Sequence, residues 1–177
     1  MKTSQKTLNF CIALTIATCS TFALADGKAR FHRKNPAGGV TAGSMGAHTG
    51  PYGGRFGGGR MIVTDGRGNG AATSGSAFKT PSGAVGARAG ATTRSADGTI
   101  QHKSGFGING AKGSATSQGQ TTVSADGTVN QSRNTSVHNA QTGNSYEGNT
   151  SYNSTDGVSH SATCYDAAGS VITCPSR

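Results

Sequence analysis

One short segment, Ser95-Ala96-Asp97-Gly98-Thr99, constrains the fold most, because it returns unchanged at 124–128 and with changes at 154–158. Asp-Gly between β-forming residues indicates a hairpin turn, since Gly accepts a positive φ without steric cost and Asp tolerates the turn. Together with Asp65-Gly66, these turns recur about every 30 residues, a spacing typical of repeat architectures. The predicted turn glycines are Gly66, Gly98, Gly127 and Gly157.

A second set of turn sequences lies midway between these, at 80–83, 110–113, 140–143 and 166–169. Turns therefore fall about every 15 residues and leave strands of about 10 residues. We predict an all-β fold over 60–177, an antiparallel meander of about eight strands built from repeated hairpins. A β-solenoid is the alternative for a fixed-period repeat. Tight turns favour the meander because they connect antiparallel neighbours. Whether the sheet is open, closed or stacked is left undecided.

Alternation of side chains predicts which strand positions share a face. Four-residue loops at the second set of turns pair Phe78 with Val85, Ile108 with Ala115, and Val137 with Tyr146. Three-residue loops at the Asp-Gly turns pair Val123 with Val129 and Tyr152 with His160.

The hairpin over 84–109 does not follow this scheme easily. A three-residue loop at Asp97 would set Arg88 opposite Phe106, an unfavourable pairing of a charged side chain with an apolar one. We therefore expect a two-residue turn there, and the register of this hairpin stays open.

Residues 1–25 have the pattern of a signal peptide. Lys2 and Lys6 precede an apolar stretch over 8–17, and Ala23-Leu24-Ala25 offers a small-residue cleavage site. We expect export of a chain that begins at Asp26, to the cell surface or the extracellular space, with the periplasm as an alternative. The sequence ending at Cys19 also resembles a lipoprotein box, a second reading in which that cysteine carries a lipid.

Cys164 and Cys174 are the cysteines that remain after this cleavage. Two cysteines in an exported chain indicate one disulfide. They flank the last turn, 167–169, and are expected opposite or diagonal to each other on one strand face, a geometry that allows a cross-strand disulfide.

Positive charge is concentrated in the first half of the mature chain, with twelve Lys and Arg against three Asp over 26–112. We read 26–59 as a flexible, basic, Gly-rich arm, because so much Gly has a high ordering cost. Basic residues interleaved with aromatic ones favour a polyanionic partner, here lipopolysaccharide, acidic polysaccharide or extracellular DNA. The predicted contacts are Lys28, Arg30, Arg33, Lys34, Arg55, Arg60 and Arg67.

No arrangement of residues indicates catalysis, a cofactor or a metal site. Six of the seven acids are Asp residues, four of them directly before a turn Gly, and Glu147 alone lies within a predicted strand. His102 and His160 follow corresponding turns, which the repeat explains without a metal ligand. We therefore expect a protein that is not an enzyme.

The last hairpin, Tyr165-Asp166-Ala167-Ala168-Gly169 followed by Val171 and Thr173, resembles one unit of the tyrosine-aspartate repeat proteins, whose units are β-hairpins in secreted shells. The chain as a whole is similar to Gly/Ser/Asn-rich secreted proteins of Gram-negative bacteria, a group that includes curli, but it lacks the regularly spaced Gln and Asn of curli repeats. The expectation is a secreted or surface structural protein that supports adhesion or matrix assembly, with self-association as one way in which it does so. The alternative is a monomeric module that binds an anionic polymer through its basic arm.

Overall fold

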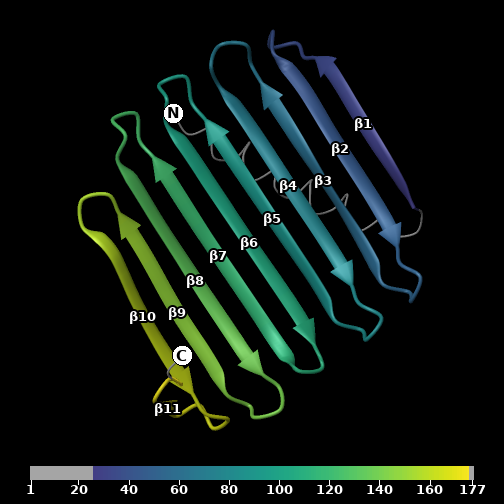
Figure 1. Ribbon diagram of the computed structural model, residues 1–177. Coiled ribbons are helices and arrows are strands. Elements are labelled where there is room, and N and C mark those ends of the chain that lie inside the picture. Colours follow the sequence, from purple (N-terminus) through teal and green to yellow (C-terminus); the bar gives the residue numbers. More distant parts are fainter. Residues whose placement is uncertain (1–25, 176–177) are drawn as a thin grey trace.

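The computed structural model describes residues 26–175, which form one open antiparallel sheet with its strands in sequence order (Figure 1). The predicted all-β meander is confirmed, with eleven strands rather than about eight. The strands are β1 (Gly27–Lys34), β2 (Val40–Thr49), β3 (Arg55–Thr64), β4 (Gly70–Lys79), β5 (Val85–Arg94), β6 (Ile100–Gly110), β7 (Gly113–Val123), β8 (Val129–Asn139), β9 (Ser145–Asn153), β10 (Gly157–Tyr165) and β11 (Val171–Ile172). The predicted signal peptide and Cys19 lie outside the described residues.

The additional strands come from the basic segment 26–59, and the prediction of a flexible arm there is wrong. This segment forms β1, β2 and the first part of β3, each paired along its length with the next strand. Glycine-rich strands bury little side-chain area, so the interstrand backbone ladders order this segment. Strand propensity is a weak guide in such cases, because neighbouring strands decide whether a segment pairs.

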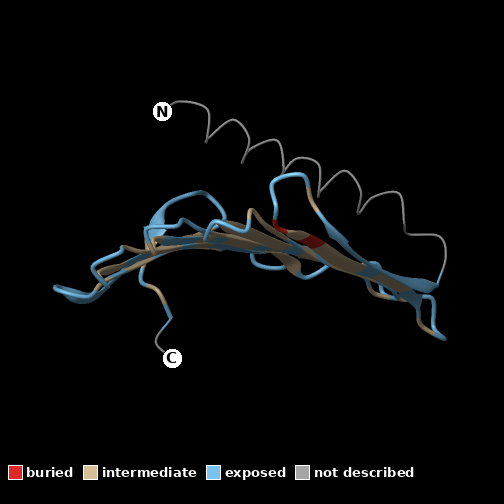
Figure 2. Cartoon of the chain, turned by 90° about the horizontal axis from the view of Figure 1, so that it is seen from above, coloured by how far each residue is buried: buried red, intermediate tan, exposed pale blue. Residues whose placement is uncertain are grey.

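The sheet is one layer thick, as its edge-on view shows (Figure 2). Gly39, Thr41, Ser117 and Cys164 are the buried residues within 26–175. A sheet normally buries one face against a second layer. Both faces of this sheet are open to solvent, so neither carries a conventional core.

The Asp-Gly turns adopt the predicted geometry, with φ of 71° at Gly66, 92° at Gly98, 87° at Gly127 and 80° at Gly157. At Asp97 and Asp126 the loop has three residues. It is closed by the Ser95 N–H donating to the Thr99 carbonyl (2.9 Å) and by the Ser124 N–H donating to the Thr128 carbonyl (2.9 Å). Each Asp side chain also accepts a backbone N–H two residues later. The repeated segment is therefore a three-residue hairpin loop.

The prediction of a two-residue loop at Asp97 is wrong. The turn has the same three-residue form as the turn at Asp126, and the register sets Arg88 opposite Phe106. This pairing is tolerated because both side chains lie on an open face, where the Arg88 guanidinium stays hydrated and its Nε donates to Ser76 Oγ (3.0 Å).

Two other predicted pairs are wrong, while Val123–Val129, Ile108–Ala115 and Val137–Tyr146 are confirmed. Phe78 lies opposite Gly86 and not Val85, because the loop after Thr80 has three residues rather than four. Tyr152 lies opposite Val158 and not His160. There Asn153 begins the turn, and its Oδ1 accepts the N–H of Thr155 (2.7 Å).

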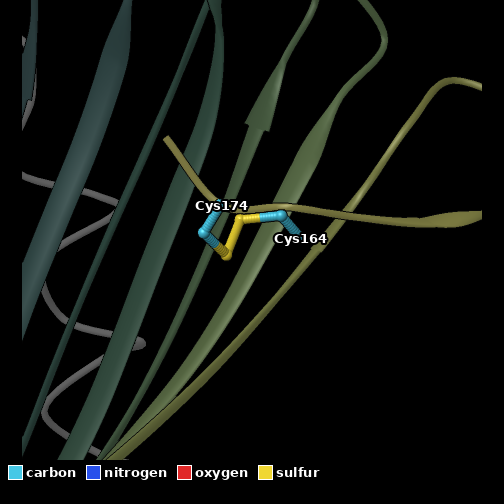
Figure 3. Close-up of a disulfide and its surroundings, with 2 residues drawn as sticks. All are labelled: Cys164 and Cys174. Atoms are coloured by element: carbon cyan, nitrogen blue, oxygen red, sulfur yellow. A yellow bond between two sulfur atoms is a disulfide. The ribbon is translucent and has the colours of Figure 1, made fainter. Parts of the chain in front are cut away.

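The predicted disulfide joins Cys164 to Cys174, with a Cα–Cα distance of 5.2 Å (Figure 3). Cys164 lies opposite Ile172, so the bond runs diagonally across the last hairpin. Only two residue pairs, Cys164–Ile172 and Tyr165–Val171, connect β11 to β10. The disulfide therefore holds the chain end against the sheet.

Candidate functional site

The register divides the strand residues between two faces, and one face collects most of the apolar side chains. Residues directly opposite each other in an antiparallel sheet point to the same side. We call the side that carries Phe106 the apolar face and the opposite side the polar face. Nine of the exposed large apolar residues lie on the apolar face: Phe56, Ile62, Phe78, Ile100, Phe106, Ile108, Val137, Tyr152 and Val158.

These side chains form bands toward the two ends of the strands. One row across the sheet contains Phe56, Phe78, Gly86, Ile108, Ala115, Val137, Tyr146, Cys164 and Ile172. At the other end, Ile100, Val123 and Val129 share a row. About eight residues of strand, on the order of 26 Å, separate the two rows.

Positive charge lies on the same face, mostly between the apolar bands. Its Lys and Arg residues are Lys28, Arg30, Lys34, Arg60, Arg88, Arg94 and Arg133. Within 26–175 no strand residue of this face is Asp or Glu, since Glu147 lies on the polar face and the aspartates precede or follow strands; Asp26, just before β1, contacts His48 at one corner of the face. The strands of the apolar face therefore carry positive charge and no carboxylate.

Two of these arginines, Arg88 and Arg133, form hydrogen bonds with serine hydroxyl groups and not with carboxylates; the bond of Arg88 to Ser76 is described above. Arg133 Nη1 donates to Ser117 Oγ (3.0 Å) and its Nη2 to Ser104 Oγ (3.4 Å). Within the described part of the chain, the one contact within 4.0 Å between an acid and a basic side chain is His48–Asp26, which is an ion pair only when His48 is protonated. None of the seven Lys and Arg residues of the face is therefore paired with an acid.

The sheet separates the seven residues predicted to bind a polyanion. Lys28, Arg30, Lys34 and Arg60 lie on the apolar face, Arg33 and Arg55 lie on the polar face, and Arg67 lies in the turn after β3. The sequence prediction missed Arg88, Arg94 and Arg133, which join the first group from later strands. Arg88 and Arg94 are six residues apart within β5, and this even spacing, which is readable from the sequence, places both on one side of the strand.

The polar face has a shallow hollow of about 480 Å³ over β7–β10. Glu147 is the one carboxylate in its lining, and Asn149 Nδ2 donates a hydrogen bond to Asn134 Oδ1 (2.6 Å) beside it. A carboxylate pair for acid–base chemistry is not formed in this hollow.

Two turn aspartates have lowered pKa values, and local hydrogen bonds explain both. The Asn69 side chain and the backbone N–H of Arg67 lower the pKa of Asp65. The backbone N–H of Thr128 lowers the pKa of Asp126. These shifts stabilise turns and do not mark catalytic acids. Across residues 26–175, no cluster of three or more His, Cys, Asp or Glu is arranged to hold a metal.

The two edges of the sheet differ in charge. The outer edge is β1, with Lys28, Arg30, Arg33 and Lys34. The other is β10, which β11 covers only at residues 164–165, so 157–163 stay free (Figure 1). That strand carries no Lys or Arg, and Asp156 and Asp166 flank it.

Residues 26–175 contain no helix with the length and apolar character to cross a membrane. Comparison of the chain with family models, with curated proteins and with solved structures finds no match. The surfaces themselves therefore carry the functional argument.

Proposed function

We propose that the protein is an exported, non-enzymatic structural protein of the cell surface or extracellular matrix, which supports adhesion or matrix assembly by joining copies edge to edge. The observation that carries this proposal is the open sheet with two unlike free edges. An unpaired strand edge presents a row of N–H and C=O groups that another strand can complete.

Strand order makes the joining geometry simple. The sheet runs from β1 to β10 with alternating strand direction, and ten is an even number. A second copy shifted along the sheet, without being turned over, therefore places its β1 antiparallel to β10 of the first. Such a head-to-tail contact does not close on itself and produces filaments.

Charge favours this contact over the two symmetric ones. Pairing of two β1 edges would bring eight Lys and Arg residues together. Their mutual repulsion disfavours this contact, as lysines on edge strands usually do. Two β10 edges lack charge attraction. The contact of β1 with β10 places cations near Asp156 and Asp166.

The test is size-exclusion chromatography with light scattering, and electron microscopy, on residues 26–177, which contain the whole described sheet. We expect oligomers that grow into filaments with concentration. The variant Ser159→Lys/Ser161→Lys places two cations on the β10 edge and should stop growth. The matched control, Thr116→Lys/Gln118→Lys, adds the same charge at two exposed positions with the same spacing, on the same face of the interior strand β7, and should assemble normally.

A mature chain that stays monomeric over a wide concentration range would refute the proposal. Equal assembly of the edge variant and its control would refute the assignment of β10 as a contact edge.

A further inference from the structure

We propose that the apolar face docks flat on the surface of a lipid bilayer that contains anionic phospholipids. The inference does not depend on edge-to-edge assembly, because it uses the face of the sheet and not its edges. It rests on the coincidence of two properties on one side, exposed apolar side chains and unneutralised positive charge.

The apolar face is large enough to form an extensive contact with a partner. The ten long strands β1–β10, spaced about 4.8 Å apart and each about ten residues long at about 3.3 Å per residue, give a face of roughly 1,600 Å². A stable protein contact typically buries about 800 Å² per partner, and exposed apolar patches of several hundred Å² usually mark interaction sites. Val158 at 72%, Phe56 at 52% and Ile62 at 50% exposure show how little of this surface the sheet covers itself.

A second copy is a poor partner for this face. Stacked sheets lie about 10 Å apart, so two apolar faces would bring seven Lys and Arg of one copy close to seven of the other without any acid between them. The polar face of another copy does not complement it either, since that face carries Arg33, Arg55, Lys79 and Lys103 against Glu147 alone.

A hydrated anionic polymer would meet the charge but not the apolar surface. Nucleic acid bases stack on aromatic rings, yet five of the nine exposed residues are aliphatic, namely Ile62, Ile100, Ile108, Val137 and Val158. The sugar rings of an acidic polysaccharide stack on aromatic rings, but the polymer has no acyl chains to cover the five aliphatic residues. An anionic bilayer supplies both phosphate groups for the cationic stripe and an apolar interior for the bands beside it.

The chain contains no Trp, so a single introduced Trp reports on its own surroundings. Phe106→Trp places the probe on the apolar face, and Phe31→Trp places a matched probe on the polar face, at residues with similar exposure of 45% and 41%. Each variant of residues 26–177 is mixed with vesicles of phosphatidylcholine alone or of equal parts phosphatidylcholine and phosphatidylglycerol. We expect a blue shift, with quenching by brominated acyl chains, only for Phe106→Trp and only with the anionic vesicles.

The charge requirement is tested by vesicle co-sedimentation. Each Lys or Arg near an anionic surface strengthens binding about fivefold, so Arg60→Gln/Arg88→Gln/Arg94→Gln should weaken binding on the order of 100-fold. The control Arg55→Gln/Lys79→Gln/Lys103→Gln removes the same charge from the polar face and should change binding only a few-fold. Far-UV circular dichroism verifies that both triple variants keep the sheet.

Three results would overturn the proposal. Equal shifts of the two Trp probes would show that no particular face meets the bilayer. A concentration-dependent shift of the Trp at position 106 without vesicles would show that a second copy covers the face. Binding to heparin or DNA that shifts this probe, without binding to vesicles, would assign the face to a polymer. Filament formation is measured separately, so neither proposal's failure is confused with the other's.

Discussion

Removing the disulfide should release the end of the sheet while leaving the rest intact. The change is Cys164→Ala/Cys174→Ala. The disulfide spans a sequence separation of 10 residues, and the chain-entropy treatment of such a loop gives roughly 2–3 kcal/mol. Two residue pairs alone do not hold β11 against β10, because even isolated two-stranded hairpins are marginal in water. The cost should therefore appear as local opening of the last hairpin.

Hydrogen exchange measures this opening at a single amide. The Asp166 N–H donates to the Ser170 carbonyl (2.9 Å) and closes the last turn. Its protection should fall roughly 30- to 150-fold, the factor equivalent to 2–3 kcal/mol. The Ser95 N–H, which donates to Thr99 at the same distance in a distant turn of the same kind, is the internal control. Unchanged protection at Asp166 would refute the reasoning, and an equal loss at both amides would show global rather than local destabilisation.

Two further changes probe the turns. Gly113→Ala and Gly127→Ala should each cost at least about 1–2 kcal/mol of unfolding free energy in urea, because both glycines have a positive φ. Gly113→Ala should cost more than Gly127→Ala, because its Cβ would clash with the His138 carbonyl oxygen whereas Gly127 faces open space, and equal costs would contradict this. Asp65 and Asp126 have pKa values below the ordinary 3.8 in the folded chain, so the unfolded chain takes up protons first and stability is lost as the pH falls below about 4 through the lowered values. Asp65→Asn/Asp126→Asn should flatten that acid limb in pH-dependent unfolding, and an unchanged limb would exclude these two groups as its cause.

The meander could be predicted from the sequence because its turns carry local chemistry. Asp-Gly pairs at a regular spacing define hairpins without reference to distant residues, and the left-handed glycines follow directly. The strands over 27–59 have no Asp-Gly turn, but the turns at 35–38 and 50–53 have the same Pro-X-Gly form as the turn at 80–83, with a positive φ at Gly38 and Gly53. That local signal was present and was missed, because Gly and small residues in β2 and β3 remove the alternation that identifies a strand.

Register errors divide into two kinds with different consequences. Setting Phe78 beside Val85 was wrong by one residue, and a one-residue slip moves a side chain to the other face. Setting Tyr152 beside His160 was wrong by two residues, which keeps the face and is therefore invisible to alternation. The one-residue error kept the sequence analysis from recognising the apolar, cationic face. With Val85 assigned to the side of Phe78, the arginines of β5 were separated from the apolar side chains beside which they lie.

Edge-to-edge growth and docking of the apolar face on a bilayer are compatible, because the even number of strands from β1 to β10 allows copies to join without being turned over. A copy added by translation across ten strands keeps its apolar face on the same side as the first copy. A growing sheet would therefore present one continuous surface that is apolar and cationic, and each added copy would contribute seven more Lys and Arg toward the same bilayer. Because the membrane attraction of linked copies multiplies, its loss multiplies as well, so the Arg60→Gln/Arg88→Gln/Arg94→Gln variant should show a larger fold loss of membrane affinity when assembled than as a monomer. Comparing its vesicle binding with and without Ser159→Lys/Ser161→Lys measures this coupling, and an effect of the same size in both backgrounds would show that the two surfaces act independently.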